Sequence, residues 1–207
     1  MEEISFSIDN RSENVDPVHI VIFQKNGPLG NGSLPVALES YTLHRFSKTE
    51  FKIDPHLVIT ASLPDHKELR SIAVKLGQEV WVEGEKGKIK LSLAPVSHNP
   101  AGTVGVVNNS QNDDVSIDLC RGLHPLMRRE GLIQTYAVVY NVVEDFWIGV
   151  TKELLPVGSV LSADVLAEVN TEISYLGISS ATIVLTGGGS GPAAQPYEFV
   201  LENIHFQ

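Results

Sequence analysis

The sequence predicts an all-β protein with the architecture of an antiparallel β-sandwich. Apolar and polar residues alternate with a period of two in roughly ten short segments. Turns rich in Gly, Pro, Asn and Asp separate these segments, and no long run shows the 3.6-residue period of a helix. Short strands without long helices are typical of sandwiches and barrels, which also limit the number of exposed sheet edges.

The stretch 17–25, Pro-Val-His-Ile-Val-Ile-Phe-Gln-Lys, is the predicted centre of the fold. Apolar residues occupy both of its faces, since Val21 and Phe23 alternate with Ile22 and its neighbours. A strand that is apolar on both faces is usually covered on both, so we expect it inside a sheet. The stretch 132–143 is also apolar on both faces, and we expect it to form a second buried centre.

Half-buried strands are expected along the rest of the chain, with a hairpin around the turn at 83–87 as the clearest signal. Residues 162–176 are ambiguous, because helical spacing competes with a strand pattern over 171–176; the β-rich surroundings favour a strand. The other expected strands are 3–9, 41–46, 57–63, 71–76, 80–82, 88–93, 115–119, 146–151, 182–186 and 197–201.

The chain divides by composition into two β halves of similar length. We expect an N-terminal half at 1–96, a linker or long loop rich in Asn, Gly, Ser and Pro at 97–114, and a C-terminal half at 115–204. The halves are either two related β units or parts of one sandwich. A three-residue echo between Ser-Ile-Asp at 7–9 and at 116–118 is too short to establish a repeat.

The charge of the chain argues against nucleic acid and anionic membranes as partners. The net charge is −10 with 15 Lys and Arg, whereas nucleic-acid binding needs clustered basic residues. No apolar run is long enough for a membrane helix, and the acidic start does not resemble a Sec signal peptide. We therefore expect a protein without membrane insertion that is cytoplasmic, or exported without a Sec signal peptide. Cys120, the only cysteine, allows no internal disulfide.

The Gly-rich run Gly187-Gly188-Gly189 is the first candidate binding site. It follows a predicted strand, as a phosphate loop does, but Pro192 and Ala193 stand where a phosphate loop needs Lys and Ser or Thr. A tight connection is the favoured interpretation, and contact with a small ligand or partner is the alternative.

Trp81 and Trp147 are the second candidate binding site, because each falls on the face opposite an apolar row. An exposed indole ring stacks on a sugar or on a partner side chain, whereas a covered one is ordinary core. The core interpretation is favoured for both.

Metal and catalytic sites have weak support in the sequence. His66-Lys67-Glu68 matches half of an iron-binding triad, with His98 or His124 as a third ligand, but it lies in a charged segment typical of a surface. We predict no cofactor, no metal and no catalytic residue. Three Asn-x-Ser sequences begin at Asn10, Asn31 and Asn108, and they are glycan acceptors only in a glycosylating pathway.

Several motifs together resemble a family of uncharacterised bacterial proteins that are often labelled as the small subunit of an aromatic ring-opening dioxygenase. The motifs are Ile8-Asp9-Asn10, Pro17-Val18-His19 with Ile22-Phe23-Gln24-Lys25-Asn26, Trp147-Ile148-Gly149-Val150, Leu176-Gly177-Ile178 and Thr186-Gly187-Gly188-Gly189. The label implies a component of an iron-dependent enzyme. No position matches an iron-binding motif, so the resemblance transfers no catalytic residue.

We expect a non-enzymatic protein that acts by contact, either by self-assembly into a homo-oligomer or by binding a protein or glycan partner. A lectin-like module that binds carbohydrate through a Trp is the first alternative, and an iron-dependent ring-opening dioxygenase component is the second. The last six residues, 202–207, resemble a protease recognition sequence used on purification tags, and they are equally compatible with a native strand.

Overall fold

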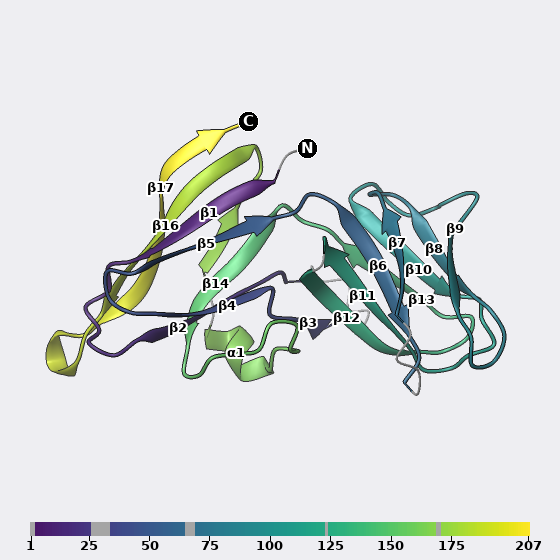
Figure 1. Ribbon diagram of the computed structural model, residues 1–207, viewed down its shortest axis with the longest axis horizontal. Coiled ribbons are helices and arrows are strands. Elements are labelled where there is room, and N and C mark those ends of the chain that lie inside the picture. The colour runs from purple at the N-terminus through teal and green to yellow at the C-terminus, as the bar shows by residue number, and fades with distance from the viewer. Residues whose placement is uncertain (1–2, 26–33, 65–68, 123, 169–170) are drawn as a thin grey trace. The chain divides into compact units, whose positions relative to one another are not determined.

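The computed structural model describes residues 3–25, 34–64, 69–122, 124–168 and 171–207 (Figure 1). Contacts divide the chain into two compact units, and both are discontinuous in sequence. Unit 1 contains Met1–Phe23, Ala37–Pro55 and Glu144–Gln207, and unit 2 contains Gln24–Val36 and His56–Val143.

Unit 1 is a sandwich of two four-stranded sheets, ordered β17-β16-β1-β5 and β15-β14-β2-β4. The inward faces meet in an aromatic cluster: the Phe146 ring lies edge-on to Phe6 and Phe51, with centroids 5.2 and 5.6 Å away. The strands are β1 (Ile4–Asn10), β2 (Val18–Phe23), β4 (Glu39–Leu43), β5 (Lys48–Ile53), β14 (Asp145–Thr151), β15 (Thr171–Ser174), β16 (Ile178–Gly188) and β17 (Gln195–Phe206).

Unit 2 is a second sandwich, with sheets ordered β13-β10-β8-β9 and β3-β12-β11-β6-β7. Its two sheets are joined across the core by the buried Tyr140, whose hydroxyl donates to the Ile117 carbonyl at 3.1 Å. The strands are β3 (Leu34–Pro35), β6 (Leu57–Ser62), β7 (Arg70–Val74), β8 (Glu79–Glu83), β9 (Lys90–Leu93), β10 (Thr103–Asn108), β11 (Val115–Arg121), β12 (His124–Leu132) and β13 (Ala137–Asn141).

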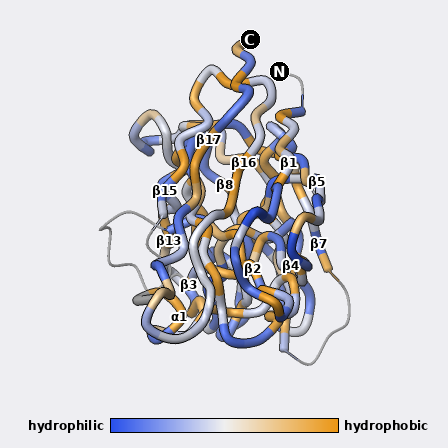
Figure 2. The backbone as a smooth tube through the Cα atoms, turned by 90° about the vertical axis from the view of Figure 1, so that its left-hand side faces the viewer, coloured by the Kyte–Doolittle hydropathy of each residue, from blue (hydrophilic) through white to orange (hydrophobic). Residues whose placement is uncertain are grey.

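These sheets confirm the predicted all-β class and sandwich architecture. Hydrophobic and hydrophilic residues follow one another along the strands (Figure 2). The predicted central strand is β2, which lies between β14 and β4 with five of its six residues buried. The pairing is antiparallel except between β1 and β16 and between β10 and β8, which run parallel.

The predicted second centre at 132–143 is wrong. Leu132 ends β12, a turn with Thr135 at φ +68° follows, and β13 is an edge strand with alternating burial. The apolar run is continuous in sequence because it spans the end of one strand, a turn and the next strand. The buried counterpart of β2 in unit 2 is β11, which lies between β12 and β6.

Residues 162–176 contain both predicted structures. Helix α1 (Ala163–Glu168) is followed by β15, and the Ser162 hydroxyl accepts a hydrogen bond from the Val165 amide at 3.4 Å. The short 3-10 helix η1 (Gly191–Ala193) lies between β16 and β17. A six-residue helix is unstable alone, so α1 depends on its packing against the sheet.

The contact pattern divides the chain differently from the predicted halves. The expected linker at 97–114 contains β10, an inner strand of its sheet. Its Asn-rich and Gly-rich ends resemble a loop, but Thr103–Val106 is buried throughout. Both units therefore take strands from both halves of the sequence.

The two units share one strand topology once the chain is divided into four modules. Module 1 is β1, β2, β4 and β5, module 2 is β6–β9, module 3 is β10–β13 and module 4 is β14–β17. Unit 1 combines modules 1 and 4, and unit 2 combines modules 3 and 2 together with the two-residue strand β3. In this order β1, β2, β4 and β5 correspond to β10–β13, and β14–β17 correspond to β6–β9. Every neighbouring pair in unit 1 then has a counterpart in unit 2 with the same direction.

Candidate functional site

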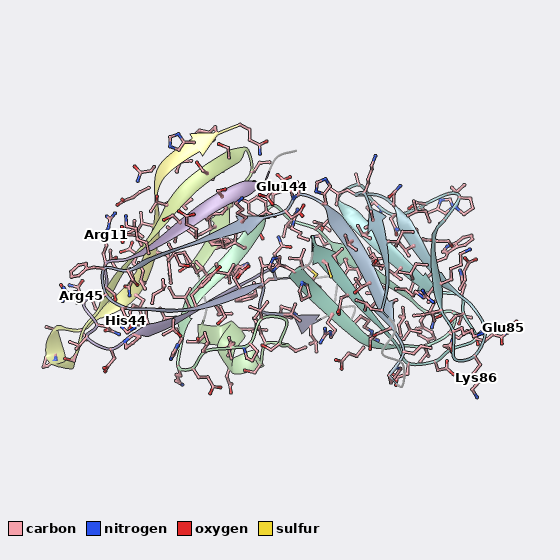
Figure 3. All side chains as sticks on the ribbon, in the orientation of Figure 1. Arg11, His44, Arg45, Glu85, Lys86 and Glu144 are labelled. Carbon is pink, nitrogen blue, oxygen red and sulfur yellow. The ribbon has the colours of Figure 1, made fainter. Side chains whose placement is uncertain are left out.

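A buried asparagine organises the loop that links the two sheets of unit 1. The Asn10 amide nitrogen donates to the carbonyls of Leu43 and His44, both at 3.1 Å, and its side-chain oxygen accepts the Ser12 amide at 3.0 Å. Its backbone also pairs with Ser47 and with Phe46, which has a φ of +62°. The neighbouring Arg11 lies at this end of unit 1 (Figure 3).

Asn108 makes a similar set of bonds in unit 2, with Leu132 in the place of Leu43 and the loop residue Asn112 as its second acceptor. Its amide nitrogen donates to the carbonyls of Leu132 and Asn112 at 2.8 Å, and its side-chain oxygen accepts the Ser110 amide at 3.0 Å. Its backbone carbonyl accepts from Thr135, another residue with positive φ. The two loops have matching sequences, Asn-Arg-Ser-Glu-Asn at 10–14 and Asn-Asn-Ser-Gln-Asn at 108–112.

Sequence reasoning missed these loops, although a signal was present. Asn10 and Asn108 begin two of the three Asn-x-Ser sequences, which were interpreted only as possible glycan acceptors. Both side chains are at most 1% exposed, and each holds backbone groups from several segments. The five-residue pattern Asn-x-Ser-x-Asn, rather than the Ser-Ile-Asp echo, marks the related positions.

The Gly-rich run has a role in packing within unit 1. Gly187, Gly188 and Gly189 all have positive φ, and the Asn14 side-chain oxygen accepts the Gly189 amide at 2.6 Å. A Cβ at Gly187 would overlap the Pro196 carbonyl oxygen. In unit 2, the Asn112 side-chain oxygen accepts the Gly87 amide at 2.6 Å, and a Cβ at Gly84 would overlap the Lys88 carbonyl oxygen. These contacts support the predicted tight connection, and they leave a ligand-binding role a prediction.

Trp147 packs against the outer face of one sheet of unit 1. It contacts a buried apolar cluster of Val21, Phe23, Ala37 and Leu161, together with the α1 residues Val165 and Leu166. Val165 and Leu166 of α1 pack against the same cluster, and Trp147 is half-buried there. The core interpretation of Trp147 stays a prediction.

Trp81 is half-buried, and it lies on the outer face of the β13-β10-β8-β9 sheet of unit 2. The flanking Val80 and Val82 point into the core. The Trp81 indole nitrogen donates to a Glu79 carboxylate oxygen at 2.8 Å, and Ser92 on β9 donates to Glu83 at 2.6 Å. The ring thus has a fixed orientation beside two carboxylates and a hydroxyl.

The described residues contain no cluster of three or more His, Cys, Asp or Glu side chains that could hold a metal ion. The candidate triad His66-Lys67-Glu68 lies outside the described residues. Burial, followed by the charge of Asp118, raises the pKa of the Cys120 thiol to about 11. This thiol is therefore protonated near neutral pH and is a poor nucleophile.

A shallow polar groove of about 260 Å³ lies on the outer face of the β17-β16-β1-β5 sheet of unit 1. It is lined mainly by small hydroxyl side chains, with Glu50, Asn203 and His205 at its borders. A row of small polar residues on a sheet is an ordinary solvated surface, so the groove defines no ligand by itself.

Strand β17 forms one edge of the same sheet and is unusually long. It has twelve residues and pairs with β16, and no described strand lies on its other side. Val200, Ile204 and Phe206 are 43%, 39% and 71% exposed. The strand contains no Lys or Arg, but Pro196, Glu198 and Glu202 and the register shifts in its pairing with β16 protect parts of this edge. Its exposed apolar residues Val200, Ile204 and Phe206 are the strongest candidate interaction site in unit 1.

The fold and these surfaces define a protein of two β-sandwich units with an accessible sheet edge. No helix among the described residues is long and apolar enough to cross a membrane. Comparison with known proteins found no matching family model, curated protein or solved structure. The resemblance to the dioxygenase-labelled family therefore stays a prediction.

Proposed function

We propose that the protein acts by self-assembly, with copies joining through addition of strands at the β17 edge. The observation that carries this proposal is the twelve-residue edge strand with exposed apolar side chains. An edge strand offers a row of backbone donors and acceptors, and pairing with a second copy satisfies them. The exposed side chains of Val200 and Ile204 add apolar area to that contact.

The other sheet edges are less suited to this contact. Strand β5, at the opposite edge of the same sheet, carries Lys48 and Lys52, and β7 begins with Arg70. The remaining edge strands β3, β4, β9, β13 and β15 have two to five residues each. Short or cationic edges resist pairing with another chain, which leaves β17 as the preferred one.

Light scattering coupled to size-exclusion chromatography tests the proposal. At a protein concentration of about 100 μM, which exceeds a dissociation constant in the micromolar range, the native chain should elute as oligomers. Val200→Lys and Ile204→Lys should each shift it toward monomer, because a Lys on the edge has to be desolvated when strands pair. Val96→Lys is the matched control, since Val96 is 65% exposed and lies outside any strand.

A native chain that is monomeric at every concentration would overturn the proposal. So would oligomers that persist unchanged in both β17 variants.

Glycan binding at Trp81 is a second candidate function. The half-buried ring, held by Glu79 and flanked by Glu83 and Ser92, has the combination of a flat apolar face and hydroxyl-binding groups that sugars need. Trp147→Ala provides the control, because that ring packs beside α1. On a glycan array, Trp81→Ala should lose binding that Trp147→Ala retains. Absence of binding by the native chain would reject this candidate.

A further inference from the structure

The pairing of modules in the two units carries an inference about how copies join. Module 2 follows module 1 in sequence, yet it completes a sandwich with module 3, and module 1 is completed by module 4. Because the units have the same topology, the junction of modules 2 and 3 is equivalent to the junction of modules 4 and 1. The chain connects the first junction covalently through residues 94–102, whereas modules 4 and 1 are separated in sequence by modules 2 and 3.

We propose that the second junction also closes between copies, so that module 4 of one chain completes unit 1 with module 1 of the next. This inference goes beyond the proposed self-assembly at the β17 edge, because it names a second contact between copies and the segments exchanged there. Repetition of the junction joins copies head to tail. Two copies that exchange reciprocally close into a ring instead.

All contacts of this junction remain available when its two modules come from different chains. The parallel pair β1–β16 and the antiparallel pair β2–β14 form its backbone. The aromatic contacts of Phe146 with Phe6 and Phe51 join the sheets, and the Gly189–Asn14 bond closes the loop end. Residues 142–144 are the only connection between unit 2 and module 4. A change in the backbone path of this short segment is therefore enough to direct module 4 to another copy.

The junction of modules 4 and 1 forms the same bonds whether both modules come from one chain or from two. The protein concentration therefore decides which of the two forms is populated. Modules 1 and 4 of one chain are held together by short connections to unit 2, so their effective concentration is of the order of millimolar. Exchange between copies is therefore expected to rise steeply as protein concentration approaches that range, and when chains refold together from denaturant.

A disulfide across β1 and β16 distinguishes the two modes of closure in the full chain. Ser7 and Thr182 are register neighbours on this parallel pair, and both face the polar groove. Chains with Cys120→Ser, Ser7→Cys and Thr182→Cys are refolded at about 1 mM, the effective concentration expected for closure, and then oxidised. On non-reducing electrophoresis, exchange produces a covalent dimer or a ladder of higher species, and closure within the chain produces only monomer.

The matched control carries Cys120→Ser, Thr182→Cys and Glu202→Cys. These two cysteines are neighbours on β16 and β17, within one module, so their bond stays inside the chain in either mode. A monomer-only pattern for the Ser7–Thr182 pair at all concentrations, with the control fully oxidised, overturns the inference. If light scattering then still shows oligomers that the β17 variants dissolve, the proposed function survives without the exchange.

Discussion

At the scale of single residues, the Asn108 side chain bonds to three buried backbone groups of unit 2. Asn108→Ala removes the donor to the Leu132 and Asn112 carbonyls and the acceptor for Ser110, and leaves these groups buried. We expect a loss of about 2–4 kcal/mol in the free energy of unfolding, since each unsatisfied buried group costs about 1–3 kcal/mol. Urea unfolding followed by fluorescence measures it. The exposed Asn109→Ala is the control, and an equal effect of both would contradict this role.

Asp145 gives unit 1 a dependence on pH. Partial burial, followed by a hydrogen bond and charge repulsion from Glu172, raises the pKa of the Asp145 carboxyl to about 6. The folded state then binds this proton more tightly than the unfolded state does. The contribution is fully present below the unfolded pKa near 4 and is lost as pH rises through about 6.

Unfolding midpoints at pH 5 and pH 7 test this dependence. The native chain should be more stable at pH 5 with respect to this carboxyl, and Asp145→Asn should raise stability at pH 7 while reducing the difference between the two pH values. Glu153→Gln is a control on an exposed carboxylate. An unchanged difference in Asp145→Asn would show that other groups cause it.

Single residues were also where the sequence was least informative. Asn10 and Asn108 hold the carbonyls of Leu43 and Leu132, which lie 33 and 24 residues away, so their local pattern does not contain these partners. For the same reason the two tryptophans look alike in sequence, because both interrupt an apolar alternation. Only the packing of α1 beside Trp147 distinguishes them.

At the scale of elements, two glycines, one near the end of β16 and one in η1, test why glycine is required there. Gly187 and Gly191 both have positive φ, but a Cβ at Gly187 would overlap the Pro196 carbonyl oxygen, whereas the space around Gly191 is open. Both Ala variants should lower the free energy of unfolding by about 1 kcal/mol because of backbone strain, and Gly187→Ala should lower it by about 2 kcal/mol more because of the overlap. Thermal unfolding measures the difference, and equal melting temperatures would contradict the steric explanation.

Period-two patterning predicted most strands because each has one face in a local core. It placed β2 correctly, since a strand that is apolar on both faces has to lie inside a sheet. It failed at 132–143, where apolar residues continue through the turn at Thr135. It failed again at β10, whose buried residues stand between loops of similar composition, so that the strand resembled part of a linker.

At the scale of the whole molecule, the equivalence of the two junctions predicts a successful circular permutation. Ser5 is the register neighbour of Ser180 and Phe206 that of Ile178, so β1 and β17 flank β16 at the same end. A linker of about nine residues between the end of β17 and the start of β1 is long enough to cross β16, a distance of roughly 10 Å. The new chain ends are placed within residues 94–102, so the permutation breaks only the covalent connection between modules 2 and 3.

The permuted chain should keep the far-ultraviolet circular dichroism of the native chain and melt within a few degrees of it. The reason is that the permutation interchanges two equivalent connections and breaks no strand pair. Loss of the β signal would show that residues 94–102 contribute more than a connection.

The pairing of module 1 with module 4 has a consequence during synthesis on the ribosome. Unit 2 can fold once residue 143 has emerged, but module 1 lacks its partner until module 4 is made. At ordinary translation rates, β1 and β2 wait about 8–30 seconds after residue 55 is added. On a messenger RNA that carries several ribosomes, module 4 of a leading nascent chain can therefore reach the waiting β1 and β2 of the chain behind it before that chain has made its own module 4.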